Sequence, residues 1–346
     1  MKKILVTGGA GFIGSNFIKI CLEDEIEILN FDLLTYAGNL NNLKLSNECE
    51  NYYFVKGDIC DSDVFSKYLN EFNPDSIVHF AAESHVDRSI DKPDNFIKTN
   101  VNGTYTILNE TLKYYKRNKN FKFIHVSTDE VFGSLDKSGS FDENSPYNPN
   151  SPYSASKASS DFLVRAWNKT YSFPGIITNC SNNYGPYQFP EKLIPLVIIN
   201  CMDNQKIPIY GNGENIRDWI YVEDHCNALK FILENGRIGE KYNIGSNEER
   251  TNIEIVSLIC EIMDLEYPSK KVGSYKELIN FVEDRPSHDF RYAVNSTKIR
   301  EELGWNEKYD LKTGLVKTVK WYLENIEWIN DIRLNKYNLE RLGKVK

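Results

Sequence analysis

The sequence has no long apolar run and few residues suited to metal binding or disulfide formation. Its 346 residues include seven cysteines and five histidines, and the cysteines are scattered and never spaced as CxxC. This pattern argues against a disulfide framework and against a zinc site, so we expect reduced, mostly buried thiols and no bound metal. The longest apolar stretch, around residues 193–199, contains Pro195 and is far shorter than the ~20 residues that cross a bilayer.

The sequence also has fewer basic than acidic residues. Lysine and arginine total 41 against 49 acidic residues, giving a formal net charge of -8, which argues against nucleic acid or anionic membranes as partners. The apolar run that begins at Ile4 ends before Thr7, which is too short for a secretory signal. We therefore expect a cytoplasmic protein that binds neither nucleic acid nor membrane.

Short β-branched runs alternate with helical patterns through the first half of the chain. Strands are expected at 4–6, 26–31, 53–55, 76–80 and 121–126, and helices at 14–22, 61–72, 95–116 and 154–171. This alternation predicts an α/β fold with a doubly wound parallel sheet of the Rossmann type, whose ligands lie beyond the carboxyl ends of the strands.

The sequence pattern changes after about residue 180, where prolines and glycines cluster and the expected secondary-structure elements become shorter. Helical patterns return at 223–235, 252–263 and 310–325. We expect a Rossmann domain at 1–180 with returning segments around 215–245, and a smaller α/β substrate-binding lobe at mainly 181–330. The last segment, 331–346, is expected to be a C-terminal tail.

A glycine-rich turn follows the first expected strand and opens the first helix. Gly8, Gly9, Gly11 and Gly14 satisfy both GxGxxG and GxxGxxG, and glycines there let the backbone approach a pyrophosphate at the positive helix end. Asp32 stands 18 residues after Gly14, at the end of the second strand. Its carboxylate suits ribose hydroxyls and repels a 2′-phosphate, which favours NAD over NADP.

Tyr153 and Lys157 stand four residues apart, so on a helix they share one face. We expect the ammonium to favour phenolate and to lower the tyrosine pKa from about 10. Tyr153 would then act as a base for a substrate hydroxyl as hydride leaves for NAD. With the Rossmann start, this pair resembles the extended short-chain dehydrogenase/reductase family, whose members add a Ser or Thr, here Thr128.

Asp129 and Glu130 follow Thr128 directly. A solvated turn would explain them, but water elimination from a sugar needs one group to remove a carbon-bound proton and another to protonate the leaving hydroxyl. Simple dehydrogenation or C4 epimerisation needs neither. The pair therefore indicates dehydration, and adjacent carboxylates help one of them to hold a proton, although these residues leave open which is the acid.

Longer motifs make the resemblance more specific. They look like those of the dTDP-glucose 4,6-dehydratase group of nucleotide-sugar dehydratases, and the match spans roughly residues 1–325: 81–89 (AAESHVDRS), 127–131 (STDEV), 153–157 (YSASK), 181–186 (SNNYGP), 190–195 (PEKLIP), 211–221 and 284–288 (DRPSH). The resemblance implies a homodimeric lyase of deoxysugar or polysaccharide synthesis, with NAD regenerated in each turnover.

The resemblance also implies a role for each catalytic residue. Tyr153 takes the 4-hydroxyl proton as hydride passes from C4 to NAD, Thr128 hydrogen-bonds that oxygen, and Lys157 tunes Tyr153 and holds the nicotinamide ribose. Glu130 then removes the C5 proton and Asp129 protonates the departing C6 hydroxyl. Hydride returns to C6, which leaves a 4-keto-6-deoxy sugar nucleotide.

The remaining site residues carry over from the matched motifs. Residues expected to contact the cofactor are Gly8, Gly11, Phe12, Ile13, Gly14, Asp32, Leu33, Thr35, Asp58, Ile59, Ala81, Ala82, Thr99, Tyr153, Lys157 and Asn183. Residues expected to contact the substrate are Ser84, Thr128, Asn182, Lys192, Leu193, Pro208, Ile209, Tyr210, Arg217, Asn252, Asp284, Arg285 and His288. Ser287 stands where the family often has Gly, and we expect a small shift in the substrate pocket there.

Other functions stay open. The segment 208–210 fits a thymine-binding pattern, but relatives that act on UDP-, CDP- or GDP-linked sugars share most of the chemistry, and a 2-acetamido sugar could replace glucose. A C4 epimerase would not need Asp129 and Glu130. A non-catalytic NAD-sensing scaffold would not need Thr128, Tyr153 and Lys157.

Overall fold

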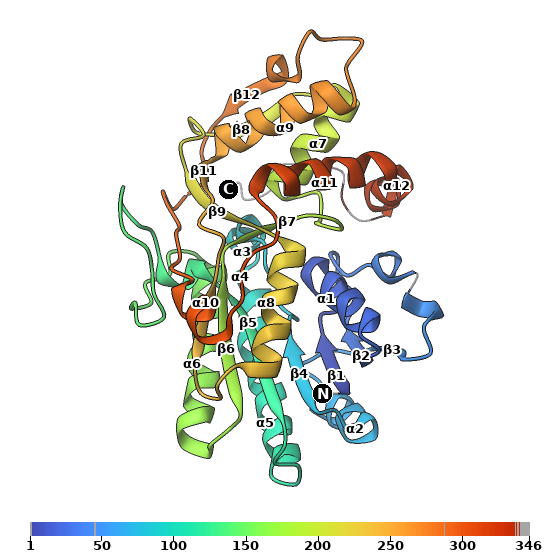
Figure 1. The fold of residues 1–346 in the computed structure, drawn as a ribbon, viewed down its shortest axis with the longest axis vertical. Coiled ribbons are helices and arrows are strands. Elements are labelled where there is room, and N and C mark those ends of the chain that lie inside the picture. The colour runs from blue at the N-terminus through green and yellow to red at the C-terminus, as the bar shows by residue number, and fades with distance from the viewer. Residues whose placement is uncertain (1, 45, 287, 336, 338, 340–346) are drawn as a thin grey trace.

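The chain forms two lobes in the computed structural model, which describes residues 2–44, 46–286, 288–335, 337 and 339 (Figure 1). A seven-stranded parallel sheet is the centre of the larger lobe. Its strands lie in the order β10 (Lys241–Ile244), β6 (Gly175–Cys180), β5 (Lys122–Thr128), β4 (Ser76–His79), β1 (Lys3–Thr7), β2 (Glu27–Asp32) and β3 (Tyr52–Lys56). The expected Rossmann-type α/β fold is confirmed.

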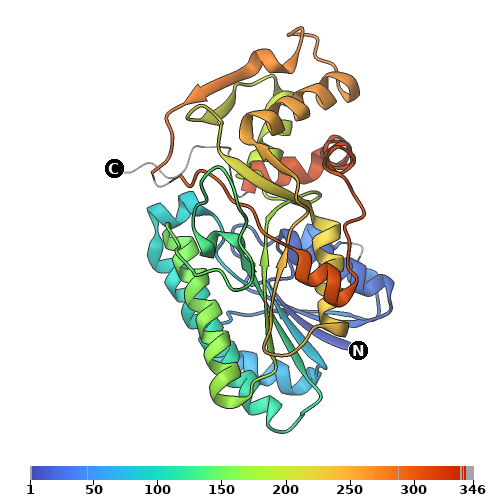
Figure 2. The same ribbon diagram turned by 60° about the vertical axis from the view of Figure 1, so that its left-hand side comes forward.

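Helices cover both faces of this sheet (Figure 2). Alternation along β1 assigns the faces, because Ile4 and Val6 pack in one core cluster while Leu5 packs in another. The cluster around Ile4 contains side chains from α1 (Phe12–Glu23), α8 (Val222–Asn235) and α10 (Thr297–Leu303). The cluster around Leu5 contains side chains from α2 (Ser62–Phe72), α5 (Thr104–Tyr115) and α6 (Pro152–Tyr171).

The single helix expected at 95–116 has a wider turn at its start. After α3 (Val86–Asp91), α4 (Pro93–Phe96) leads into a π-helical stretch, Ile97–Gly103, and then into α5. Asn100 in this stretch is buried and donates hydrogen bonds to the Glu83 carbonyl (2.9 Å) and to the Ser156 hydroxyl (2.8 Å). The wider turn therefore ties the helix to the loop after β4, at the site edge of the sheet.

The smaller lobe has its own apolar core, drawn from segments after residue 180. It contains α7 (Leu193–Asp203), α9 (Asn252–Glu266), α11 (Leu311–Glu324), α12 (Ile326–Asn335) and the parallel strands β8 (Ile207–Tyr210) and β12 (Ile279–Val282). Between the lobes lies a three-stranded sheet of β7 (Asn182–Tyr184), β9 (Ile216–Tyr221) and β11 (Glu249–Thr251) (Figure 1). Single-turn 3₁₀ segments lie at Leu40–Leu43, Ser46–Glu48, Asp129–Phe132 and Tyr275–Leu278.

The chain passes between the lobes more than once, because α8, β10 and α10 return to the larger lobe after β9. The expected residue boundaries near 180 and 330 therefore stay a prediction. Residues 331–335 of the expected tail continue α12, and most of the remaining tail lies outside the described residues.

Three sequence expectations concern absent features. Within the described ranges, no helix is both long and apolar enough to cross a membrane. The same ranges contain no group of three or more side chains that could hold a metal ion. Five cysteines are buried free thiols: Cys21, Cys180, Cys201, Cys226 and Cys260.

Candidate active site

A cleft of about 300 Å³ opens beyond the carboxyl ends of β1, β2, β4, β5 and β6. Every residue expected to contact the cofactor lines this cleft: Gly8, Gly11, Phe12, Ile13, Gly14, Asp32, Leu33, Thr35, Asp58, Ile59, Ala81, Ala82, Thr99, Tyr153, Lys157 and Asn183. Thr128, Asp129 and Glu130 line it as well. The segments that supply these side chains are far apart in the sequence, and the parallel sheet brings them to one edge.

The glycine turn leaves no room for side chains. Gly8 has φ +72°, and a Cβ there would lie 2.5 Å from the Ala81 amide nitrogen. A Cβ at Gly14 would lie 2.5 Å from the Gly8 carbonyl oxygen. Gly11 is the N-cap of α1, so the first turn has neither a capping side chain nor an acidic residue. Its amide N–H groups and the positive end of the helix dipole are therefore suited to an anion.

Asp32 presents a carboxylate at the end of β2. Its two oxygens accept hydrogen bonds from the amides of Ala10 (2.9 Å) and Leu34 (2.7 Å), which orient the group at the cleft wall. Each carboxylate oxygen can accept a further bond, so the residue is suited to ribose hydroxyls. The turn and Asp32 together fit an NAD-type dinucleotide.

Tyr153 and Lys157 lie one turn apart on α6, but the expected lowering of the tyrosine pKa is wrong. The Lys157 ammonium donates a hydrogen bond to the Val126 carbonyl at 2.9 Å, and burial lowers its pKa to about 8. Burial, and next the charge of Glu130, raise the pKa of Tyr153 well above 10, although a hydrogen bond with Thr128 opposes this. Desolvation outweighs the shared helix face that the spacing predicts.

Asp129 is buried at the carboxyl end of β5, with 1% of its surface exposed. Burial raises the pKa of its carboxyl well above the ordinary value, and the negative charges of Glu130 and Asp218 raise it further. Thr128 caps the turn, and its hydroxyl contacts Asp129 Oδ1 at 3.3 Å. These surroundings favour the protonated form of Asp129.

Glu130 is half-buried and has a different electrostatic environment. Burial raises its pKa, but the positive charges of Arg285, Lys192 and Arg217 lower it, in that order. The three cations come from separate segments: after β12, before α7 and within β9. These residues, each predicted to contact substrate, therefore converge on Glu130 and oppose the rise of its pKa, although burial outweighs them and the pKa stays above its ordinary value.

Several predicted substrate contacts lie in the smaller lobe, beyond the walls of the cleft. Ile209 is 1% exposed and its side chain packs in the core of that lobe, and its predicted contact stays a prediction. His288 Nδ1 lies 2.6 Å from Asp284 Oδ1, and Ser287 between them lies outside the described residues. The remaining members of this group keep their predicted roles as predictions: Leu193, Pro208, Tyr210, Asn252, Asp284 and His288.

Two substrate candidates that line the cleft have informative contacts. The Asn182 side-chain oxygen is buried and has no hydrogen-bond partner among the described residues, so a ligand would satisfy it. The Lys192 ammonium donates to the Ser84 carbonyl at 3.0 Å, which ties together two predicted contacts.

Glu191 lines the cleft but was not among the predicted site residues. Its side chain is 2% exposed and accepts from Arg88 Nε (2.7 Å) and from the Tyr36 hydroxyl (2.9 Å). Its place between Pro190 and Lys192, in a motif already singled out, is the signal that could have indicated it. Gly57 was missed too, although it follows β3, and a Cβ there would lie 2.2 Å from the Phe31 ring.

Fold and site together define a Rossmann-type protein with two adjacent carboxyl groups in a cleft that fits a dinucleotide. A family model described as GDP-mannose 4,6 dehydratase matches residues 5–318, and the chain belongs to this family. It is 52% identical to a probable dTDP-glucose 4,6-dehydratase of Sinorhizobium fredii, over 99% of this chain and 98% of the relative.

Solved structures agree with this assignment. The dTDP-glucose 4,6-dehydratase from Bacillus anthracis in complex with NAD superposes with a TM-score of 0.86 at 47% identity, covering 96% of this chain and 100% of that one. The dTDP-glucose 4,6-dehydratase from Streptomyces venezuelae with NAD and TYD bound gives 0.89 at 44% identity, covering 95% and 99%.

Proposed function

We propose that the chain catalyses the NAD-dependent dehydration of dTDP-glucose to the 4-keto-6-deoxy sugar nucleotide. The observation that carries this proposal is the pair Asp129 and Glu130, which lie side by side in the cleft but among different charges. A proton donor and a proton acceptor in one cleft are what an elimination needs. Family membership and the names of the relatives support the same reaction.

The residues that would hold NAD are those that fit it physically. The amides around Gly11 and Phe12 suit the pyrophosphate, Asp32 suits the adenosine ribose, and Lys157 is the candidate for the nicotinamide ribose. Bound NAD supplies the acceptor for hydride from C4 of the sugar and the donor that returns it to C6.

Tyr153 is the proposed base for oxidation at C4. Its phenolate takes the proton of the 4-hydroxyl and becomes the neutral phenol, and Thr128, which already hydrogen-bonds Tyr153, holds the same oxygen. Because burial disfavours the phenolate, the Lys157 ammonium one turn away supplies the positive charge that this proton transfer needs.

Elimination is divided between the two carboxyl groups. The new C4 ketone acidifies the C5 hydrogen, and Glu130, whose carboxylate is stabilised by three cations against the effect of burial, removes that proton. Asp129, kept protonated by burial and by neighbouring carboxylates, gives its proton to the departing C6 hydroxyl. Burial raises both pKa values, but it raises that of Asp129 further above its ordinary value, which supports Asp129 as the acid and Glu130 as the base.

Lys192, Arg217 and Arg285 are the proposed partners of the substrate diphosphate, since guanidinium and ammonium groups bind phosphate oxygens well. Thymine is the proposed base because the relatives act on dTDP-glucose and residues 208–210 fit that pattern. Other nucleotides or a 2-acetamido sugar would change the substrate but leave the elimination intact.

The substrate and the reaction are tested together by incubating the protein with a panel of nucleotide hexoses in deuterated water. We expect dTDP-glucose to be consumed fastest, with loss of water and deuterium at C5, as followed by mass spectrometry and NMR. An epimerised product without water loss would overturn the proposal, as would a clear preference for a UDP-, CDP- or GDP-sugar for its substrate part.

We also propose that the protein is a cytoplasmic homodimer. Three large apolar side chains are exposed along the helical run that forms one outer side of the larger lobe: Ile97 (49%), Tyr105 (49%) and Phe162 (52%). Exposed apolar side chains gathered on neighbouring helices favour burial against a second copy. The free thiols support a reducing compartment.

A further inference from the structure

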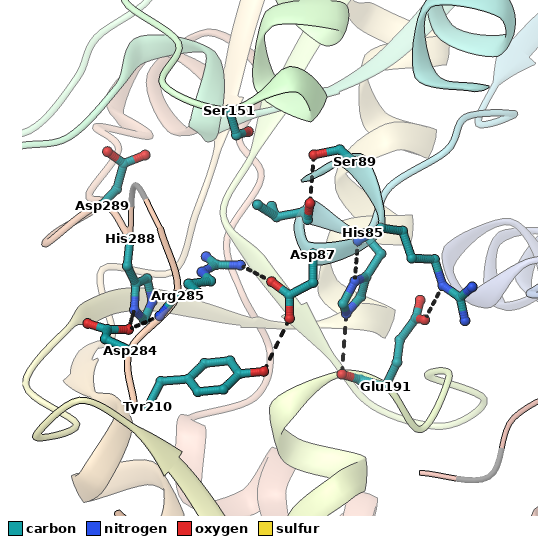
Figure 3. Close-up of polar contacts among 12 residues, drawn as sticks. His85, Asp87, Ser89, Ser151, Glu191, Tyr210, Asp284, Arg285, His288 and Asp289 are labelled. Atoms are coloured by element: carbon teal, nitrogen blue, oxygen red, sulfur yellow. Dashed lines mark hydrogen bonds and ion pairs between the residues drawn. The ribbon is translucent and has the colours of Figure 1, made fainter. Parts of the chain in front are cut away.

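The segment 84–88, which leads into α3, links the two lobes at the mouth of the cleft (Figure 3). It belongs to the AAESHVDRS motif, in which the proposed reaction gives no role to Asp87 or Arg88. Both side chains contact residues distant in the sequence: Asp87 contacts Arg285, and Arg88 contacts Glu191. The motif therefore has a tertiary function besides following β4.

Asp87 holds two residues of the smaller lobe with its two carboxylate oxygens. Oδ1 accepts a hydrogen bond from Arg285 Nη1 at 2.9 Å, and Oδ2 accepts one from the Tyr210 hydroxyl at 3.3 Å. Figure 3 shows the Asp87 carboxylate between these two partners. Asp87 is 5% exposed, so its charge is costly to bury unless it stays paired, which makes the contact with Arg285 a strong constraint.

Arg285 has further N–H donors besides the Nη1 group that binds Asp87. Its Nε is buried and has no hydrogen-bond partner among the described residues, and its charge acts on Glu130. A guanidinium group has five N–H donors in a rigid fork, so a partner on one side fixes where the others point. The free donors of Arg285 are therefore available to an anionic ligand beside Glu130.

The same segment holds the second cation of the site. The Ser84 carbonyl accepts from Lys192 Nζ at 3.0 Å, and Glu191, the residue before Lys192, is clamped by Arg88 at 2.7 Å. His85 Nε2 also lies 3.4 Å from the Glu191 carbonyl. Residues 84–88 thus contact the local surroundings of both Lys192 and Arg285.

We propose that Asp87 is a positioning residue that orients Arg285 toward the diphosphate of the bound nucleotide sugar and so couples the two lobes across the cleft. This inference rests on the proposed function, because it takes the ligand to be a nucleoside diphosphate. Asp87 contacts no reacting atom in this arrangement. It acts through Arg285.

The test compares ligands with and without the diphosphate on the NAD-loaded protein. Asp87→Asn, which keeps the size of the side chain but removes its charge, is expected to weaken dTDP binding about tenfold in calorimetry, the loss of one oriented charge-assisted bond. Thymidine binding is expected to change less than about twofold, since thymidine has no phosphate. KM for dTDP-glucose should rise in parallel with the dTDP Kd, with kcat changed less than about threefold.

Three further variants separate positioning from general damage. Asp87→Glu keeps the charge and is expected to retain most of the dTDP affinity. Arg285→Gln should weaken dTDP binding, and adding Asp87→Asn to it should cause little further loss, because both changes act through one contact. Glu240→Gln removes the charge of an ion pair with Lys298 (2.7 Å) that lines another pocket, and should leave both affinities unchanged.

Equal loss of dTDP and thymidine binding in Asp87→Asn would overturn the inference, and so would unchanged dTDP affinity or fully additive losses with Arg285→Gln. If Asp87→Asn does not fold, Asp87→Glu and Arg285→Gln carry the same comparison. Failure of the proposed function is distinguished by the wild-type protein, which would then neither bind dTDP nor dehydrate dTDP-glucose.

Discussion

The ammonium group of Lys157 donates a hydrogen bond to the Val126 carbonyl oxygen at 2.9 Å, from the first half of α6 to the centre of β5. Lys157 is only 4% exposed, so a positive charge is held almost entirely out of water next to the strand that carries Thr128. Burial of that charge lowers the pKa of Lys157 from 10.5 to about 8. The positive charge of Lys157, which the proposed reaction uses, therefore lowers the stability of the folded protein.

Lys157→Met is expected to stabilise the protein at neutral pH while abolishing turnover. The folded pKa is about 8 against 10.5 unfolded, so burying the ammonium costs roughly 3 kcal/mol below pH 8, and the cost fades as the pH rises to 10.5. The variant also loses the hydrogen bond to Val126, which lowers its stability by about 1 kcal/mol. The net increase in the free energy of unfolding is therefore roughly 2 kcal/mol at pH 7.

Urea unfolding of both proteins at pH 7 and pH 10 measures this difference. The gain should be clear at pH 7 and should shrink or reverse at pH 10, where the folded wild-type lysine is neutral. A variant that is less stable than wild type at pH 7 would show that the buried ammonium is not a net cost.

Asp129→Asn and Glu130→Gln are expected to stop the reaction at different points. Each should lower turnover by roughly 10² to 10⁴, the usual value of a positioned acid or base. Without Glu130 the C5 proton stays in place, so no deuterium enters the sugar from deuterated water. Without Asp129 the base still works, so C5 exchanges while water is retained.

Mass spectrometry of recovered dTDP-glucose in deuterated water separates these outcomes, because reversal of C4 oxidation returns any label to the substrate. Loss of exchange in Asp129→Asn, or continued exchange in Glu130→Gln, would mean that the two roles are wrongly assigned. The high pKa of Asp129 further predicts that the elimination rate of the wild type falls as the pH rises through it.

Gly8→Ala is expected to damage both the fold and NAD binding. Gly8 has φ +72°, and an added Cβ would lie 2.5 Å from the Ala81 amide nitrogen, which is backbone and cannot swing away. Gly304→Ala is the matched control, since Gly304 has φ +73° with nothing within 4 Å of an added Cβ.

The control should therefore lose only the about 1 kcal/mol of a left-handed alanine. Gly8→Ala should lose at least about 2 kcal/mol more and bind NAD at least tenfold less tightly. Equal losses in urea unfolding would indicate that the turn relaxes without cost.

Phe162→Glu is expected to dissociate the proposed homodimer, since it places a charge among the exposed apolar side chains of α5 and α6. Leu265→Glu is the control, because Leu265 is 83% exposed on α9 in the other lobe. Analytical ultracentrifugation should show a dimer for wild type and Leu265→Glu and a monomer for Phe162→Glu. A dimer in all three would place the interface elsewhere.

Most of the larger lobe could be predicted from local pattern. The apolar run Ile4, Leu5 and Val6, followed by a helical pattern, indicates a strand that is buried on both faces. That prediction does not depend on distant parts of the chain. The wide turn at Ile97–Gly103 was not predicted, because its periodicity differs from an α-helix by one residue over a single turn. The pairing of β8 with β12 was not predicted either, since the two strands lie about seventy residues apart and nothing local links them.

The cofactor side of the cleft was predicted more fully than the substrate side. Gly8 follows β1, Gly14 lies in the first turn of α1 and Asp32 ends β2. Parallel strands bring their carboxyl ends to one edge, so order along the chain already implies that these residues lie close together. Lys192, Arg217 and Arg285 come from separate segments that only tertiary folding brings to Glu130. The contacts of Asp87 were not predicted for the same reason, since its partners Tyr210 and Arg285 lie in the other lobe.

The sequence by itself determined the glycine turn, the alternation of strands and helices, and the presence of an acidic pair beside a Tyr–Lys pair. Those features depend on residues within one or two turns of each other. Only the tertiary structure decided that burial and nearby carboxylates raise the pKa of Asp129 well above its ordinary value, that three cations converge on Glu130, and that burial raises the pKa of Tyr153. A pKa depends on burial and on charges brought from distant segments, and neither can be read from neighbours along the chain.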